Sequence, residues 1–131
     1  MTGSYSLVKP TTWLVRVSAG PSDLTKLFQG LDCVLACGAF EQSVSVVFEG
    51  DALAWLTAPS NSEDVTLVSE RLERDPIKLL RSLPLYDIAE IFVLDAEKVS
   101  LRADLNELTL SPIGGHDFQQ LIANSQFTLG F

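Results

Sequence analysis

Two carboxylates flank a glycine at Glu49-Gly50-Asp51, directly after an apolar stretch with the pattern of a buried strand. Open α/β sheets bind ligands beyond the carboxyl ends of their strands, so two carboxylates here could work as a general acid and a general base. The same residues also suit a solvated turn in which Gly50 supplies backbone freedom. We expect the second: Glu49, Gly50 and Asp51 shape a turn near a possible subunit contact, and no catalytic residue is predicted.

The cysteines and the histidine are the other residues that could do chemistry. Cys33 and Cys37 lie far inside a predicted helix, whereas a reactive thiolate needs a helix N-terminus or a cationic neighbour, so inert thiols are predicted. Together with the single histidine, His116, they do not supply the four ligands of a structural zinc site. His116 follows Gly114-Gly115 at a predicted helix start, where an anion could bind, but the full glycine-rich pattern is missing and a plain turn is expected. No metal or cofactor is predicted.

The composition is that of a globular chain. It has 131 residues, of which 47% are hydrophobic and 20% charged, and this length corresponds to one ordinary domain with its own core. Nine basic residues against 17 acidic ones give a formal net charge of -8, which argues against direct binding of nucleic acid, because such binding depends on Lys and Arg meeting phosphates. The mean hydropathy of +0.24 is high for a small monomer and indicates that another subunit covers part of the surface.

The chain carries no pattern of membrane insertion or export. No apolar stretch approaches the roughly 20 residues of a membrane-spanning helix. Residues 1–9 lack the charged segment and long apolar run of a secretory signal. Two cysteines without export suit thiols in a reducing compartment, so a cytoplasmic protein is expected. Residues 1–10 are predicted to be a loose leader, and residues 11–131 a single domain.

Strands and helices are predicted to alternate along the chain. Apolar and β-branched runs predict strands at residues 11–19, 43–49, 90–96, 108–113 and 127–131. Helices are predicted at residues 24–38, 76–83 and 116–124, with Ser22 or Asp23 capping the first. Strands buried on both faces appear as continuous apolar runs. The pattern therefore predicts a three-layer α/β domain, with a mainly parallel five-stranded sheet and helices on both faces.

The helix predicted at residues 24–38 has two unusual faces. One is a continuous apolar stripe that we expect to cover the sheet, formed by Leu24, Leu27, Phe28, Leu31 and Leu35. The opposite face is small rather than charged, and consists of Gly30, Cys33, Ala36 and Cys37. Small residues let another backbone approach closely, so this second face is a candidate subunit interface. The alternative is that the leader or residues 57–75 of the same chain cover it.

Three stretches resemble one known family. Residues 30–56 (GLDCVLACGAFEQSVSVVFEGDALAWL), 79–96 (LLRSLPLYDIAEIFVLDA) and 117–131 (DFQQLIANSQFTLGF) are similar to the TusC/DsrF branch of the DsrE-like family. The resemblance implies the flavodoxin-like fold of that family. The chain departs from the family pattern in the turn after the first strand, in the Ala-Leu that follows Gly50-Asp51, and in residues 61–75.

The resemblance implies a subunit of a sulfur-relay complex. In such complexes, homologous TusB-like and TusD-like (DsrH-like and DsrE-like) subunits assemble with the TusC-like one into a hetero-hexamer. The TusD-type subunit carries the persulfide cysteine in a loop, and the corresponding residues 61–76 contain no cysteine here. The family thus implies a non-catalytic scaffold that supports 2-thiolation of the wobble uridine of tRNA. Three alternatives stay open: a DsrF-type subunit of sulfur oxidation, a homo-oligomeric DsrE-like protein that binds a small ligand, and a small enzyme using Glu49, Asp51 or His116.

Overall fold

The computed structural model describes residues 11–56, 76–95, 105 and 108–131. Five strands form one sheet in the order β4-β3-β2-β1-β5, and each neighbouring pair is parallel. The strands are β1 (Thr11–Val17), β2 (Val44–Phe48), β3 (Ile91–Leu94), β4 (Leu110–Ile113) and β5 (Ser125–Gly130). The predicted five-stranded sheet is therefore confirmed. The expectations for residues 1–10, 57–75, 96–104 and 106–107 lie outside the described residues.

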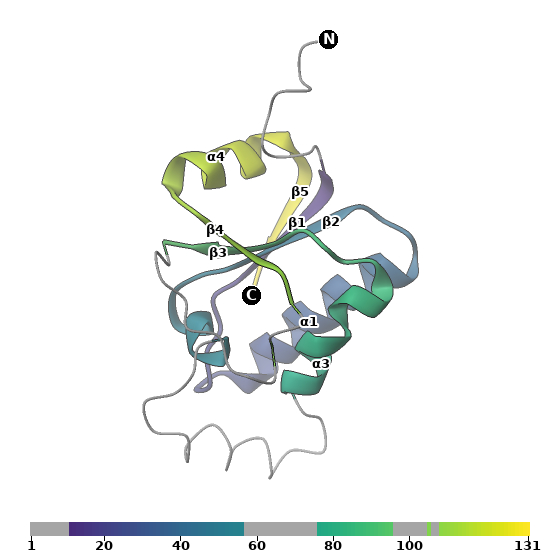
Figure 1. The fold of residues 1–131 in the computed structure, drawn as a ribbon, viewed down its shortest axis with the longest axis vertical. Helices are drawn as coiled ribbons and strands as arrows, with labels where there is room; N and C mark the ends of the chain where they lie inside the picture. Colours follow the sequence, from purple (N-terminus) through teal and green to yellow (C-terminus); the bar gives the residue numbers. More distant parts are fainter. Residues whose placement is uncertain (1–10, 57–75, 96–104, 106–107) are drawn as a thin grey trace.

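Helices cover both faces of this sheet, as predicted. Two of them, α1 (Leu24–Ala39) and α3 (Pro76–Ser82), lie on one face, and α4 (Gly115–Asn124) lies on the other (Figure 1). Two short 3₁₀ helices, η2 (Gly50–Trp55) and η3 (Leu83–Tyr86), follow β2 and α3. In the part of the chain that the structure describes, none of the helices has the length and apolar character to span a membrane.

The alternation of side chains along the strands divides the core into two clusters. Towards α1 and α3, strand residues such as Val15, Val46 and Phe48 pack with Leu27 and Leu31 of α1. Towards α4 the cluster is smaller, and its buried members are Leu14, Val47, Phe92, Ile113 and Leu121. The layer beneath α4 is thus the thinner one, and a charged side chain of β1 can reach the surface there.

The predicted stripe on α1 packs against the core through Leu24, Leu27, Leu31 and Leu35, but the buried face extends round the helix beyond that stripe. The helix begins as expected, with the Asp23 carboxylate accepting a hydrogen bond from the amide of Lys26 at 3.3 Å. Its buried residues, however, are Leu27, Gly30, Leu31 and Val34. The prediction that Gly30 faces away from the core is wrong, because the helix is rotated to place Phe131 over it. A Cβ atom on Gly30 would lie only 3.1 Å from the Cβ atom of Phe131.

A close approach also fixes the other end of α1 against η3. A Cβ atom on Gly38 would lie 2.9 Å from the Cβ atom of Tyr86 and 3.0 Å from its main-chain oxygen. Real Cβ atoms essentially never lie 2.9 Å from another heavy atom, and the Cβ atom of Tyr86 moves only with its backbone, so a side chain at residue 38 would have to shift the Leu83–Tyr86 turn. The positions of α1 and η3 are therefore coupled.

Gly38→Ala tests this coupling, because the added methyl must displace η3. We expect the substitution to lower the free energy of unfolding by about 1–3 kcal/mol, as overpacking does. Helix propensity alone predicts the opposite sign, a gain of about 0.5–1 kcal/mol. Gly115→Ala is the control, since a Cβ atom there meets nothing within 4 Å. Urea denaturation of both variants measures the difference, and a stabilised Gly38→Ala variant would contradict the coupling.

Candidate functional site

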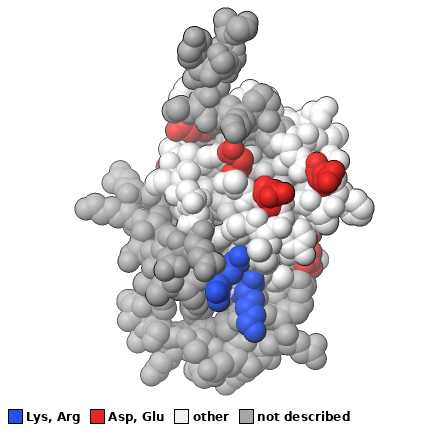
Figure 2. All heavy atoms as spheres, turned by 45° about the vertical axis from the view of Figure 1, so that its right-hand side comes forward, with Lys and Arg blue, Asp and Glu red and all other residues white. Residues whose placement is uncertain are grey.

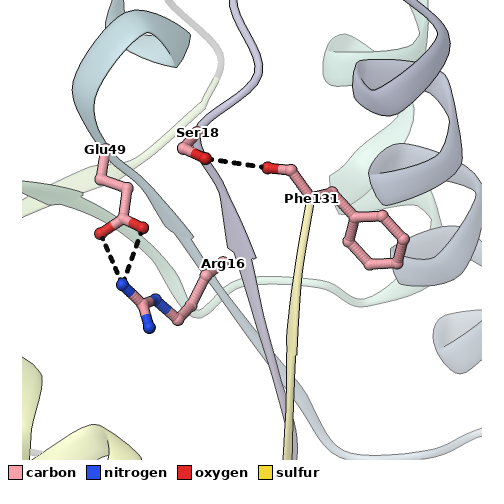
Figure 3. Close-up of polar contacts among 4 residues, drawn as sticks. All are labelled: Arg16, Ser18, Glu49 and Phe131. Carbon is pink, nitrogen blue, oxygen red and sulfur yellow. Dashed lines mark hydrogen bonds and ion pairs between the residues drawn. The ribbon is translucent and has the colours of Figure 1, made fainter.

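An ion pair lies at the carboxyl edge of the sheet, where parallel α/β folds place their ligands. Arg16 comes from β1 and Glu49 directly follows β2, and the parallel register of the two strands puts both side chains on the α4 face. Arg16 Nη2 donates to Glu49 Oε1 at 3.0 Å and lies 3.4 Å from Oε2 (Figure 3). The side chain of Glu49 is 16% exposed and that of Arg16 is 39% exposed, so water screens the pair only in part.

Arg16 also reaches the helix that covers this face. Its guanidinium carbon lies 4.8 Å from the centroid of the Phe118 ring on α4, a cation–π contact. Its Nε atom is buried and has no hydrogen-bond partner among the described residues. A guanidinium stays charged and releases no proton near neutral pH. The Arg16–Glu49–Phe118 cluster therefore has the make-up of a clamp between β1, β2 and α4, and not of an acid–base pair.

The structure accounts for the turn at residues 49–51 without chemistry. Gly50 has a φ of 57°, in the left-handed region that favours glycine. This agrees with the prediction that glycine is needed here for its backbone freedom. Asp51 is exposed in η2, and its main-chain oxygen would lie 2.6 Å from a Cβ atom on Gly20. Glu49 has Arg16 as its partner, and sequence analysis missed that residue. The signal was present, since Arg16 is the one charged residue in the predicted strand at residues 11–19.

His116 lies exposed in the first turn of α4. Its Nε2 atom lies 3.3 Å from the side-chain nitrogen of Gln120, one helical turn later. The Gln120 amide donates a hydrogen bond to Nε2 in the tautomer that leaves Nε2 unprotonated. Across the described ranges, no three His, Cys, Asp or Glu side chains are placed to hold a metal ion. These contacts fit the expected turn at the start of α4.

The two cysteines are half-buried free thiols that pack against the larger core cluster. Burial is the main cause that raises the pKa of Cys33 above the ordinary value of 9.0, and a hydrogen bond with Cys37 offsets this only in part. Burial also raises the pKa of Cys37, and both the charge that Cys33 acquires and its hydrogen bond add to the effect. Both thiols therefore stay protonated at neutral pH. This supports the interpretation that they are inert.

The four residues of the candidate interface on α1 occupy different environments. Gly30 is buried beneath Phe131, so the C-terminal end of the same chain covers it. The sequence-based alternative named two other segments, the leader and residues 57–75, for this position. Cys33 and Cys37 are half-buried, and only Ala36 is exposed. A contact with another subunit through this face could thus involve Ala36 and the edges of the two cysteines, but not Gly30.

Comparisons with known proteins find a similarity in sequence and a similarity in structure. No family model matches the chain. Over 75 residues it is 33% identical to the protein TusC homolog of Aliivibrio fischeri, a match that covers 57% of this chain and 58% of that relative. Its structure is similar to the crystal structure of the ychN protein from E. coli, with a TM-score of 0.67 over 92% of this chain and 99% of that one, at 11% identity. The structural likeness confirms the predicted flavodoxin-like α/β fold.

The ion pair between Arg16 and Glu49 should give a measurable interaction free energy in protein stability. In a double-mutant cycle with Arg16→Met and Glu49→Gln, we expect about 1 kcal/mol of interaction free energy, near the upper end for a partly exposed pair, and less at high salt. Asp51→Asn removes a neighbouring, exposed carboxylate and should change stability by no more than about 0.5 kcal/mol. Urea denaturation supplies all the values. Zero coupling at low salt would show that the clamp contributes nothing.

The thiols should react slowly. At pH 7.5 we expect iodoacetamide to alkylate Cys33 and Cys37 of the folded chain far more slowly than the urea-unfolded chain, because the reactive thiolate is depleted by burial. Gln29→Cys in a Cys33→Ser, Cys37→Ser background places one exposed thiol on the same helix as a control, and it should react at the rate of the unfolded chain. Mass spectrometry follows the reaction. Equal rates for native and control thiols would contradict the assignment.

Proposed function

We propose that this chain is a structural subunit of a sulfur-relay complex and not an enzyme, because part of its sequence is similar to a TusC homolog and its fold is similar to that of the ychN protein. The observation that carries this proposal is the similarity to the TusC homolog. The match spans 58% of that relative, so activity, partners and pathway are part of the proposal.

The chemistry of the described residues supports a role without catalysis. A sulfur carrier needs a thiolate that can attack and hold a sulfur atom, and the only two cysteines in the sequence are half-buried with raised pKa values. The carboxylate at the sheet edge, Glu49, is paired with Arg16. Sulfur transfer in the complex is therefore assigned to a partner subunit.

The partners in this proposal are homologous TusB-like and TusD-like chains, which join this one in a hetero-hexamer in the cytoplasm. The complex passes sulfur on for 2-thiolation of the wobble uridine of tRNA. With a net charge of -8, the chain itself is proposed to make no contact with tRNA. Ala36, exposed on α1, is proposed to lie at or near a contact between subunits.

Native mass spectrometry tests this assembly. We expect the chain, co-expressed with its TusB-like and TusD-like partners, to appear in a complex that contains all three polypeptides. A homo-oligomer that excludes the partners would instead favour the homo-oligomeric alternative and contradict the proposal.

Sulfur transfer by the assembled complex tests the non-catalytic role. We expect the Cys33→Ser, Cys37→Ser variant to support transfer at the wild-type rate, because neither thiol is activated. Loss of transfer on substituting the loop cysteine of the TusD-like partner serves as the control. A stable persulfide on Cys33 or Cys37, found by mass spectrometry after incubation with the sulfur donor, would overturn the proposal.

A further inference from the structure

A hollow of about 560 Å³ opens at the amino edge of the sheet, opposite the edge that holds the Arg16–Glu49 pair. Its walls are the segment that leaves α1, the start of β2, and the segment from η3 to β3. Main-chain hydrogen bonds hold both loops: Glu41 and Gln42 donate to Gly38 and Cys37 at 3.1 and 2.8 Å, and Ile88 donates to Leu83 at 3.2 Å. The hollow is therefore formed before anything binds, which lowers the entropic cost of binding.

Acidic side chains line this hollow. Glu41, Asp87 and Glu90 are among its lining residues, and the described lining includes no Lys, Arg or His. The described cations next to this surface, Lys78 and Arg81, lie with Leu85 on its outer side. The three carboxylates are too dispersed to share a metal ion, since no three such side chains among the described residues are placed to hold one. A positive side chain that enters the hollow would be attracted by carboxylates from both of its loops. On the face seen in Figure 2, separate acidic side chains lie on an otherwise uncharged area, and basic side chains lie below them.

Large apolar side chains stand exposed beside the hollow. Phe40, which lies between the lining residues Gly38 and Glu41, is 77% exposed; Leu85 is 83% exposed and Tyr86 is 43% exposed. The close approach of Gly38 to Tyr86 brings the end of α1 and η3 together, so residues far apart in sequence share one surface. Exposed aromatic and aliphatic side chains gathered around a pocket are typical of protein–protein contacts.

We propose that this hollow receives a Lys or Arg side chain of an adjacent subunit, while Phe40, Leu85 and Tyr86 pack against the apolar surface around that side chain. This inference rests on the proposed function, because the adjacent subunit is one of the homologous relay chains. The acidic lining indicates that the group bound in the hollow is basic, and the exposed apolar side chains beside it indicate that this group belongs to a protein. Ala36 lies one turn before Phe40 on α1, so the surface is continuous with the exposed part of the candidate interface.

The test uses the full-length chain co-expressed with its TusB-like and TusD-like partners. The variant Glu41→Gln, Asp87→Asn, Glu90→Gln removes the charge while keeping shape, and we expect it to raise the dissociation constant of the complex at least about tenfold and to weaken its salt dependence. Asp95→Asn is a matched control: Asp95 is also exposed, and its φ of 56° is close to the 60° of Asp87. It should assemble like the wild type.

A second pair of variants tests the apolar part. Leu85→Ser should weaken the complex, whereas Ile122→Ser, which changes an exposed aliphatic side chain on α4, should not. Native mass spectrometry over a dilution series gives the dissociation constants, and circular dichroism checks that each variant is folded. If the wild type forms the three-chain complex and the acidic and Leu85 variants bind with unchanged affinity, the docking surface is wrong but the proposed function stands. Absence of a wild-type complex overturns the proposed function and the docking surface together.

Discussion

The structure depends on the central position of β1 in the sheet. This strand is hydrogen-bonded to β2 on one edge and to β5 on the other, and its two faces contribute to both core clusters. A strand in this position has both edges paired and both faces largely covered, so its backbone groups find their partners inside the protein. Arg16 is the charged residue that this constraint affects most. Its pairing with Glu49 and Phe118 joins β1, β2 and α4.

The two edges of the sheet consequently have different characters. At the carboxyl edge, Arg16 and Glu49 pair with each other within the chain. At the amino edge, Glu41, Asp87 and Glu90 line a hollow whose described lining contains no cation. Parallel α/β sheets usually bind ligands at their carboxyl edge. In this chain, Arg16 and Glu49 at that edge bind each other, whereas the hollow at the amino edge has acidic lining residues without a cation among its described lining. This distribution suits a subunit that holds partners in place and leaves the chemistry to them.

Much of the fold follows from local patterns, and the parts that do not follow depend on contacts between distant residues. Continuous apolar runs predicted all five strands, and the Asp23 cap and apolar periodicity predicted α1, because these signals lie within a few residues of one another. The rotation of α1 could not be predicted, since it depends on Phe131 lying over Gly30. The partner of Glu49 was missed for the same reason: Arg16 is 33 positions away in the sequence, and only the strand register brings the two together. The acidic hollow likewise requires Gly38 to admit Tyr86.

The pairing of β1 with β5 also has a consequence in time. Ser18 and Phe131, which are hydrogen-bonded through the Ser18 hydroxyl and the main-chain oxygen of Phe131, are 113 positions apart (Figure 3). Contacts of such sequence separation carry a high loop-closure entropy and form slowly. While a new chain is being synthesised, the edge of β1 that pairs with β5 therefore stays open until β5 has been made. Over the same period the Trp13 ring lacks Phe127, on which it stacks in the folded protein. During that interval the open edge of β1 is exposed to pairing with other chains.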